Sequence, residues 1–477
     1  MSAHLLDRRQ FLALSGVALS AQPFRALACR GPETKTPGSG GPQGGSPADI
    51  GYGPLQLVND QTTGLPLLYL PYGFQYLSFG WAGDPLAGGL VTPGRHDGMA
   101  AFAGSGSLIR LVRNHEMFSG TAFASQPVYD VNGGGGTTTL EFDTATGAVL
   151  DSWASLAGTA VNCAGGLTPW GSWLSCEESV SGPGGDNGYE HPHGYIFEVP
   201  ANGTATAEPL VAMGRFVHEA ICVDPATGIV YETEDQGTAG FYRFSPAEVG
   251  NLAAGGQLEM LAIAGTPQAD TRIVKAGRWS PVSWVPIDDP DPAETTASSV
   301  FRQGYAGGGA RFARLEGTWY ADGRIYIVST SGGFVEAGQI WEYDPGGQRI
   351  RLIFESPSTD VLDMPDNICT SPRGGLVLCE DGTTENFIRG LTLDGQIFSF
   401  AKNNVILPVS QALYRNGQKY GVLRAISAGW NLLAPPTVQM GTGSSSTYKR
   451  RGSPLQSLDR GPTDRFDALA HCSRNNL

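Results

Sequence analysis

Four stretches of the sequence end an apolar, strand-like run on carboxylates. They are LVRNHE at residues 111–116, SWLSCEE at 172–178, VYETED at 230–235 and LVLCED at 376–381. The acids at these ends are Glu116, Glu177, Glu178, Glu234, Asp235, Glu380 and Asp381. Buried acids are costly unless cations compensate their charge, so acids delivered from distant segments to one point indicate a multinuclear metal site.

Four further motifs add acids and amides to this set. They are RHDGM at residues 95–99, GRFVHE at 214–219, RFARLEG at 311–317 and MPDN at 364–367, and they contribute Glu219, Glu316 and Asp366. A hard cation such as Ca²⁺ takes roughly six to eight oxygen ligands, so a polynuclear site needs this many donors. One such motif alone is equally well a solvated surface group, but the set predicts metal binding.

Two residues indicate what the metals could do. Arg314 and Glu316 stand two apart, which places them on one face of a strand. A guanidinium beside a metal-bound carboxylate suits an oxyanion such as phosphate, and a surface ion pair is the alternative. Cys176, next to Glu177, adds a soft ligand that favours a transition metal over calcium, with a buried core thiol as the alternative.

The composition limits the class of protein. A chain of 477 residues with 41% hydrophobic residues can bury a large core. Its 67 glycines and 32 prolines fall between short apolar runs, as expected of many strands joined by tight turns. The formal net charge of −14 argues against a nucleic-acid partner. An anionic protein that binds an anionic substrate needs metal ions or arginines at the site.

The pattern of runs and turns predicts an all-β chain from residue 51 to about residue 420. Two units look alike: residues 220–235 followed by a strand at 240–244, and residues 367–381 followed by a strand at 395–400. Repeated three-stranded units predict a β-propeller, whose inner strands surround an axial channel and bring their ends to one place. A β-sandwich is the alternative, because repeats alone do not establish closure of the ring.

Several of these motifs resemble the signature blocks of the PhoX-type alkaline phosphatase family. The matching segments are LVRNHE at 111–116, NCAGGLTPWGSWLSCEE at 162–178, RFVHE at 215–219, RLEG at 314–317 and PDNI at 365–368. The long block around Trp170 and Cys176 is the most specific of them, and the resemblance extends from about residue 51 to residue 402. It implies a six-bladed propeller, twin-arginine export, and a mixed iron and calcium cofactor, Fe³⁺ and Ca²⁺, that hydrolyses phosphate esters.

The resemblance also implies roles for individual residues. Carried over by motif, Cys176 and Glu316 are iron ligands and Arg314 is a phosphate clamp. Glu177, Glu219 and Glu234 are metal ligands, with calcium the expected ion. The strand ends and the MPDN motif add Glu116, Asp366, Glu380 and Asp381 as predicted metal ligands. The resemblance does not say which acid binds which ion.

The N-terminus has the parts of an export signal. DRRQFL at residues 7–12, a mild apolar stretch at 13–21 and ALA at 26–28 predict a twin-arginine signal over residues 1–28, read by the twin-arginine export machinery. A Gly/Pro/Ser-rich tether at 29–50 follows, and Cys29 is a candidate for lipid anchoring. The expected location is periplasmic or secreted. The seven cysteines form no C-x-x-C pair, which excludes the common zinc spacings.

The C-terminal segment, residues 421–477, departs from the strand pattern and from the family. Back-translated and read one base earlier, residues 444–457 can spell VFVNIQTPGVTFAI, which resembles the closing segment that the family should have. We therefore predict a single-base frameshift near residues 420–425, which would leave the ring incompletely closed. A natural disordered tail is the alternative.

Three functions are compatible with these observations. The first is an exported metal-dependent phosphatase or phosphodiesterase that acts on a small-molecule phosphate ester. The second is a calcium-dependent propeller hydrolase such as a lactonase, which needs no thiolate ligand. The third is a non-catalytic binding propeller, which needs neither iron nor a phosphate clamp. A monomer is the default oligomeric state.

Overall fold

The computed structural model describes residues 51–405, apart from residues 294, 295, 372, 373 and 384, together with two short strands, β23 (Tyr414–Arg415) and β24 (Gln418–Lys419). The predicted export signal at 1–28, the tether at 29–50 with Cys29, and the segment at 421–477 with the predicted frameshift all lie outside these residues. No described helix is long and apolar enough to cross a membrane.

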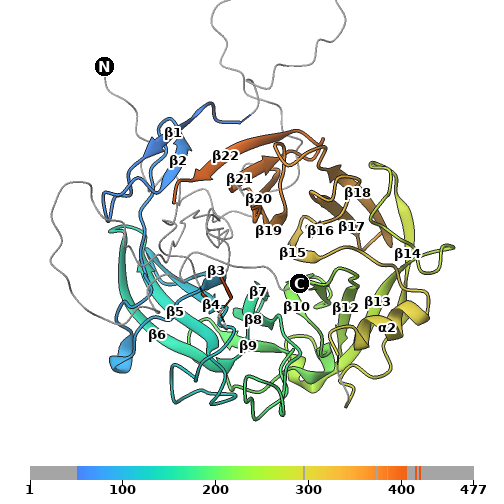
Figure 1. Cartoon of the computed structure of the whole chain (residues 1–477), viewed down its shortest axis with the longest axis horizontal. Helices are drawn as coiled ribbons and strands as arrows, with labels where there is room; N and C mark the ends of the chain where they lie inside the picture. Colours follow the sequence, from blue (N-terminus) through green and yellow to red (C-terminus); the bar gives the residue numbers. More distant parts are fainter. Residues whose placement is uncertain are drawn as a thin grey trace, which may run out of the picture.

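The described chain is all-β, as predicted, and its antiparallel sheets are arranged around a central axis (Figure 1). Unit 1 contains β3 (His96–Ala103), β4 (Leu108–His115), β5 (Gly135–Asp143) and β6 (Ala148–Thr159). Unit 2 contains β7 (Asn162–Leu167), β8 (Ser172–Glu177) and β9 (Ile196–Pro200). Unit 3 contains β10 (His218–Val223), β11 (Val230–Glu234), β12 (Phe241–Pro246), β13 (Gly256–Ile263) and β14 (Ser280–Pro286).

Two more units complete the described part of the ring. Unit 4 contains β15 (Leu315–Ala321), β16 (Arg324–Ser329), β17 (Gln339–Asp344) and β18 (Arg349–Glu355), and β18 pairs with β14 of unit 3. Unit 5 contains β19 (Pro365–Thr370), β20 (Leu376–Glu380), β21 (Phe387–Leu391) and β22 (Ile397–Asn403), extended by β2 (Leu68–Pro71) and β1 (Leu55–Val58). Helical segments are short: η2 (Ala87–Gly89), η3 (Val211–Met213), η4 (Leu252–Ala254) and α2 (Ser299–Ala306).

The predicted propeller architecture is confirmed. The inner strands β3, β7, β10, β15 and β19 surround the axis, each at the inner edge of its unit (Figure 1). The count of six blades stays a prediction, since the described residues form five units. The predicted repeat is correct for its first two strands, but the second copy skipped β21 and took part of β22 as the third strand.

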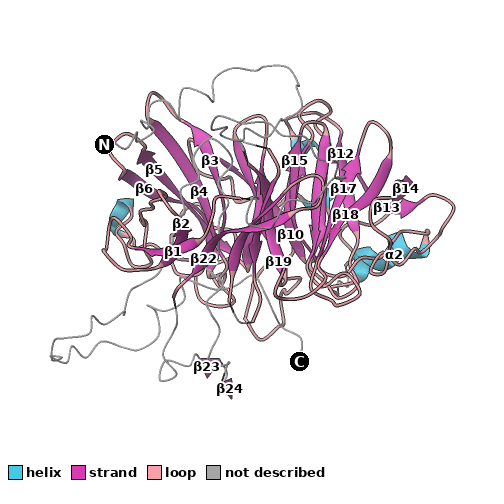
Figure 2. Ribbon diagram, turned by 90° about the horizontal axis from the view of Figure 1, so that it is seen from above, coloured by secondary structure: helices cyan, strands magenta, loops and turns pink. Residues whose placement is uncertain are grey.

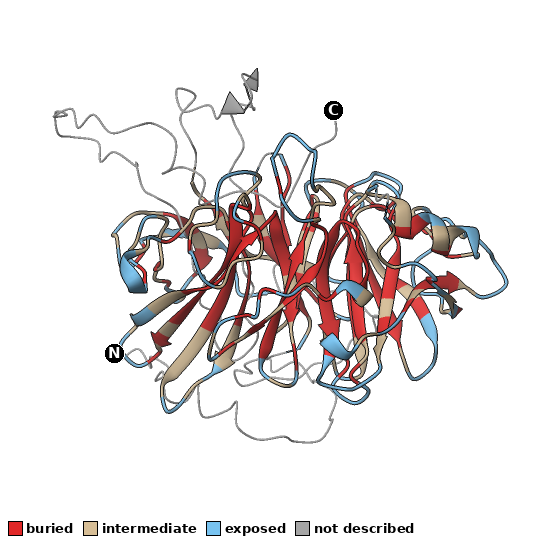
Figure 3. Ribbon diagram, turned by 90° about the horizontal axis from the view of Figure 1, so that it is seen from below, coloured by how far each residue is buried: buried red, intermediate tan, exposed pale blue. Residues whose placement is uncertain are grey.

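The strands form because both of their faces are covered. Along β16, Ile325 and Ile327 face the core between units 3 and 4, whereas Tyr326 and Val328 face the core between units 4 and 5. Side chains alternate across a strand, so a sheet packed between two neighbours requires apolar residues at consecutive positions. Figures 2 and 3 show the sheets side by side, with buried strands inside and exposed loops at the rims. Each fully buried aliphatic side chain contributes roughly 1.5–3 kcal/mol.

All five inner strands carry an irregularity at the same place. The pairing register of the inner strand with the second strand of its unit shifts directly after the first residue pair. At each bulge, two residues of the inner strand lie opposite one residue of the second strand. These pairs are Asp97–Gly98, Cys163–Ala164, Glu219–Ala220, Glu316–Gly317 and Asp366–Asn367. A bulge re-aims a side chain and bends its strand, so the first member of each pair is turned from its regular position.

Small residues at the bulges let neighbouring inner strands approach each other. A Cβ atom at Gly98 would lie 2.6 Å from the Cα atom of Ala164, and one at Gly317 would lie 2.8 Å from the Cα atom of Asn367. Backbone atoms cannot move aside as a flexible side chain can. The spacing between units at the axis therefore depends on these glycines.

We expect Gly98→Ala to lower the free energy of unfolding by about 1–3 kcal/mol, because the added methyl group meets backbone atoms of β7. Gly203→Ala is the matched control, since nothing lies within 4 Å of a Cβ atom at Gly203. Urea denaturation at a fixed metal concentration measures both. Equal stability of the two variants would contradict the packing argument.

Candidate metal centre

Each unit brings two positions to the axis: the first bulge residue of its inner strand and the residue that follows its second strand. A backbone hydrogen bond fixes this arrangement in every unit. The bonds are Glu116 N to Arg95 O (2.8 Å), Glu178 N to Val161 O (2.8 Å), Asp235 N to Val217 O (3.1 Å), Thr330 N to Arg314 O (2.8 Å) and Asp381 N to Met364 O (2.8 Å). Four of the five strand-end residues are acids.

We call the acids and the thiol at these positions the axial ring. Its members are Asp97, Cys163, Glu219, Glu316 and Asp366 from the bulges, and Glu116, Glu178, Asp235 and Asp381 from the strand ends. Polar side chains link one unit to the next at the ring. Asn114 Nδ2 donates to Cys163 O at 3.0 Å, and Thr233 Oγ1 donates to Glu316 O at 2.6 Å.

Three groups in the ring have the geometry of metal sites. They are Asp97 with Glu116 and Cys163, Cys163 with Glu178 and Glu219, and Glu219 with Glu316 and Asp366. Within each group the ligand atoms lie within 4.8 Å of one another. Cys163 and Glu219 are shared between neighbouring groups, so the three positions form one continuous chain around the axis. This is the multinuclear arrangement that the strand-end acids predict.

Some of the acids at the axis lack hydrogen-bond donors among the described residues. Asp97 Oδ2 and both side-chain oxygens of Glu116 accept no hydrogen bond from a described residue. Burial, with the neighbouring acids, raises the pKa of Asp97, Glu219 and Asp366 well above its usual range. Burial likewise raises the pKa of Glu116, although the Arg95 guanidinium opposes that shift. Buried carboxylates of this kind are stable when cations bind them, so the ring fits a metal cofactor.

Arg314 is a cation that the protein places at the ring. Its Nε and Nη2 atoms donate to the two Asp235 carboxylate oxygens at 2.8 and 2.9 Å, and Nη2 also donates to Glu316. Its side chain is 16% exposed, which leaves the guanidinium accessible at the rim. The predicted Arg314–Glu316 pair is present, but Arg314 precedes β15 at φ +47° instead of lying within the strand.

The thiol at the axis is Cys163. Its sulfur lies 2.9 Å from each carboxylate oxygen of Glu219. Cys176, the cysteine predicted as an iron ligand, lies on β8 in the hydrophobic core with Leu174 and Ile196, and burial raises the pKa of its thiol well above the usual range. Cys163 is disulfide-bonded in this structure, so its use as a thiolate ligand requires reduction.

Three of the predicted ligands do not point into the ring. Glu177 accepts hydrogen bonds from the backbone of Ala160 and Gly194, and Glu234 accepts them from the Gly240 backbone and the Tyr242 hydroxyl.

Glu380 accepts hydrogen bonds from Arg389 Nε at 2.7 Å and Phe387 N at 2.9 Å. Each of these three acids comes one residue before a ring acid. Because side chains alternate along a strand, its side chain points to the opposite face of the sheet from that ring acid. The structure brings together the predicted residues Glu116, Glu219, Glu316, Asp366 and Asp381.

Four ring residues are missing from the predicted ligands: Asp97, Cys163, Glu178 and Asp235. Glu178 and Asp235 are among the strand-end acids, and Asp97 lies in the RHDGM motif, but none of them was assigned as a ligand. Asp97 and Cys163 each precede a small residue at the start of an inner strand, as Glu219 and Glu316 also do. Glu178 and Asp235 are each the last acid of their run. The signal that could have found them has two parts. An acid or a thiol precedes a small residue on one strand, and the next strand ends on an acid.

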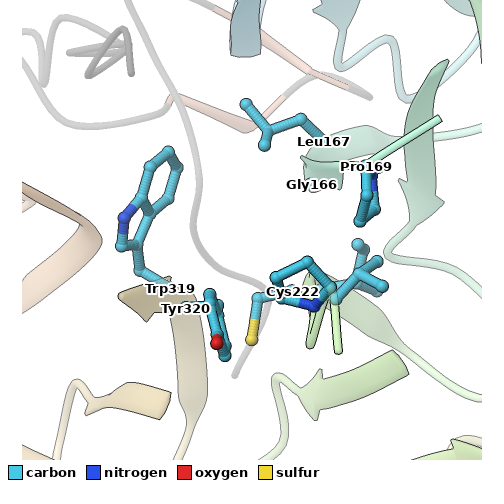
Figure 4. Close-up of a pocket in the computed structure, with 9 residues that line it drawn as sticks. Gly166, Leu167, Pro169, Cys222, Trp319 and Tyr320 are labelled. Carbon is cyan, nitrogen blue, oxygen red and sulfur yellow. The ribbon is translucent and has the colours of Figure 1, made fainter. Parts of the chain in front are cut away.

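A separate cavity of about 190 Å³ lies at the other end of the inner strands (Figure 4). Its walls come from the C-terminal parts of β7, β10 and β15 and include Leu167, Cys222 and Trp319. No acid lines it. The cavity is therefore distinct from the axial ring, which occupies the N-terminal ends of the same strands.

The family of alkaline phosphatases described as PhoX matches the chain over residues 50–145 and 134–425. The chain belongs to this family. The PhoX family is metal-dependent, and in this chain the three groups of the axial ring are where metal could bind. Membership supports phosphatase activity and agrees with the resemblance found in the sequence motifs.

A solved PhoX structure has the same fold. Pseudomonas fluorescens PhoX, determined in complex with vanadate, a transition-state analogue, is 15% identical and superposes with a TM-score of 0.54. The alignment covers 74% of this chain and 89% of that one. A search of curated proteins found no match.

Gluconolactonases are more distant structural neighbours. The enzyme from Xanthomonas campestris is 14% identical with a TM-score of 0.31, over 68% of this chain and 89% of that chain. The periplasmic enzyme from Pseudomonas aeruginosa is 13% identical with a TM-score of 0.33, over 66% and 86%. Similarity at this level carries no argument about function.

The raised pKa values of the ring acids predict how stability depends on pH without metal. An acid whose pKa is higher in the folded protein stabilises the fold below its unfolded pKa of about 4, and this contribution is lost as the pH rises through the folded value. Glu380 and Glu234, whose pKa burial raises to about 7 and about 8, titrate in the same window. We therefore expect the melting temperature of the chelator-treated protein to fall between about pH 5 and pH 8.

Metal ions should reduce this fall, because they compensate the ionised ring acids but not Glu380 or Glu234. Calorimetry with and without metal, at matched ionic strength, measures the difference. A melting temperature of the metal-free protein that stays constant or rises over this range would contradict the raised pKa values of the ring acids.

The two cysteines give a second prediction. Cys163→Ala should abolish binding of a thiophilic transition metal after loading under reducing conditions, because it removes the soft donor from the ring. Cys176→Ala should keep the metal and lower the free energy of unfolding by roughly 1–3 kcal/mol, since it only empties space in the core. Elemental analysis and urea denaturation distinguish the two. Loss of metal in Cys176→Ala with metal retained in Cys163→Ala would restore Cys176 as the ligand.

Proposed function

We propose that this chain is an exported phosphatase that hydrolyses small phosphate esters with a cofactor of iron and calcium. The observation that carries the proposal is the axial ring of buried, closely spaced acids with Arg314 beside it, in a member of a phosphatase family. A non-catalytic binding propeller has no use for this concentration of buried acids.

The donor set supports a mixed cofactor. Cys163 offers a soft thiolate once reduced, which suits iron, whereas the carboxylates of Asp97, Glu116, Glu178 and Glu219 are hard donors that suit calcium. When bound, such metals supply Lewis acidity toward phosphoryl oxygens and toward water. The sharing of Cys163 and Glu219 between groups would hold neighbouring ions close together.

Arg314 is the residue that would bind the transferred phosphoryl group. Its hydrogen bonds to described residues use Nε and Nη2, so Nη1 is available to a substrate oxygen. The fork to Asp235 fixes the guanidinium plane before substrate arrives, which avoids reorganisation when charge develops in the transition state. Asp235 is thereby a positioning residue for Arg314.

Export and location are part of the proposal. The motif at residues 7–12 and the site at 26–28 support transport by the twin-arginine machinery, which moves folded proteins, so cofactor loading before transport is compatible with a buried ring. The expected destination is the periplasm or the medium, with Cys29 as a candidate anchor. Export in a folded state also means that the cofactor would be loaded before transport, when Cys163 would be reduced.

The test is hydrolysis of a phosphate ester by protein loaded with iron and calcium under reducing conditions, with Arg314→Gln as the variant. We expect Arg314→Gln to lower turnover about 10²–10³-fold with metal content unchanged, because it removes a donor to developing charge. Arg324→Gln is the matched control: Arg324 also contacts two acids, Glu342 at 3.2 Å and Asp344 at 2.8 Å, at the other end of unit 4.

One result would refute the proposed function, and another would refute only the role of Arg314. If loaded wild-type protein fails to hydrolyse any phosphate ester, the function is wrong. If Arg314→Gln turns over as fast as Arg324→Gln, the role of Arg314 is wrong while the function stands.

A further inference from the structure

Arg95 occupies in unit 1 the position that Arg314 occupies in unit 4. Each is the residue directly before an inner strand, and each has a left-handed backbone, with φ +48° for Arg95 and +47° for Arg314. The carbonyl oxygen of each accepts a 2.8 Å hydrogen bond from the residue that follows the second strand, Glu116 in unit 1 and Thr330 in unit 4. The two arginines are therefore equivalent in the repeat.

Cations occur at only these two of the five equivalent positions in the described chain. Units 2, 3 and 5 have Val161, Val217 and Met364 there. An apolar residue is thus sufficient for the backbone arrangement, and the structure of the repeat does not require an arginine.

At the ring, the Arg95 side chain is exposed to the same degree as the Arg314 side chain. Both side chains are 16% exposed. Arg95 Nη1 lies 3.8 Å from Glu116 Oε2, and its guanidinium carbon lies 4.4 Å from the centre of the Phe118 ring. The Glu116 contact is longer than a hydrogen bond, so it is a charge contact and not a directed hydrogen bond.

The two arginines directly precede strands that lie on opposite sides of the axis. Figure 1 shows β3 and β15 facing each other across the centre, with β7 and β10 between them along the ring. The groups of the axial ring connect the two sides: Asp97 and Glu116 lie beside Arg95, and Glu316 and Asp366 lie beside Arg314. An anion bound at the ring would therefore have a guanidinium on each side.

We propose that Arg95 is a second substrate-binding arginine, which contacts the phosphate group from the side opposite Arg314. This inference rests on the proposed phosphatase function and deepens it. A phosphate monoester has three non-bridging oxygens, so one guanidinium on each side and metal below can each meet a different oxygen. The stack on Phe118 holds the guanidinium plane, as the fork to Asp235 does for Arg314.

The alternative is that Arg95 only neutralises Glu116. The two roles separate when phosphate binding and metal content are measured on the same variants. Arg95→Gln removes the charge, and Arg95→Lys keeps the charge but loses the planar fork. Arg243→Gln is the matched control, because Arg243 also pairs with a glutamate, Glu259 at 2.7 Å, and lies 4.5 Å from the centre of an aromatic ring, that of Trp284.

The experiment uses full-length protein loaded with iron and calcium. The inhibition constant of inorganic phosphate, KM and kcat for a phosphate ester, and metals per chain are measured for each variant. We expect Arg95→Gln to raise the inhibition constant and KM about tenfold or more, with metal content unchanged, and Arg95→Lys to recover part of that loss. Arg243→Gln should stay within about twofold of wild type, a difference worth less than half a kcal/mol.

An inhibition constant for Arg95→Gln within about twofold of wild type would overturn the inference while leaving the phosphatase function intact. Loss of metal in Arg95→Gln would also overturn it, because it would assign Arg95 to holding Glu116. Wild-type protein that neither hydrolyses a phosphate ester nor binds phosphate would remove both the inference and the function on which it rests.

Discussion

The mutual repulsion of the carboxylates at the axis is the constraint on which the rest of this structure depends. Burial raises the pKa of Glu219 and Asp366 well above the usual range, and each acid destabilises its neighbours further. Among the described residues, Arg95 and Arg314 form ion pairs with acids of the ring, and the ring holds more acids than these two cations. A fold with this centre is therefore a frame for cations, and its stability is linked to their presence.

The five units meet this constraint with one local device. A bulge turns an acid or a thiol toward the axis, a small residue follows it in four of the units, and a backbone hydrogen bond fixes the residue after the second strand, an acid in four of the units, beside it. The device has a cost, since the residue before the inner strand is left-handed in four units, including the β-branched Val161 at φ +52°. Such conformations cost of order 1–3 kcal/mol and persist where the surroundings determine them, as at a functional site.

The sequence predicted the propeller and the convergence of strand-end acids, because both follow from patterns that repeat along the chain. It did not distinguish Glu178 from Glu177 or Cys163 from Cys176. Neighbouring residues on a strand point to opposite faces of the sheet, so a residue faces the axis or the core according to its place in the alternation. A bulge inserts one residue and shifts this alternation by one position. Cys176 lies opposite the bulge that presents Cys163, which is why the same block suggested the cysteine on the neighbouring strand. The third strand of unit 5 was missed because β21 is short and contains Arg389 and Gly390.

The pairing of β2 with β22 joins the first described strands to the last unit, with Leu68 opposite Asn403 and Tyr69 opposite Lys402. During synthesis β1 and β2 leave the ribosome first, and their partner is made only when almost the whole chain has followed. Until then their edges stay unpaired and open to association with other chains. Closure of this sheet is a contact of very high sequence separation, which makes it slow. The first described strands therefore wait longest for their partner, so the seam between β2 and β22 is expected to be among the last contacts to form.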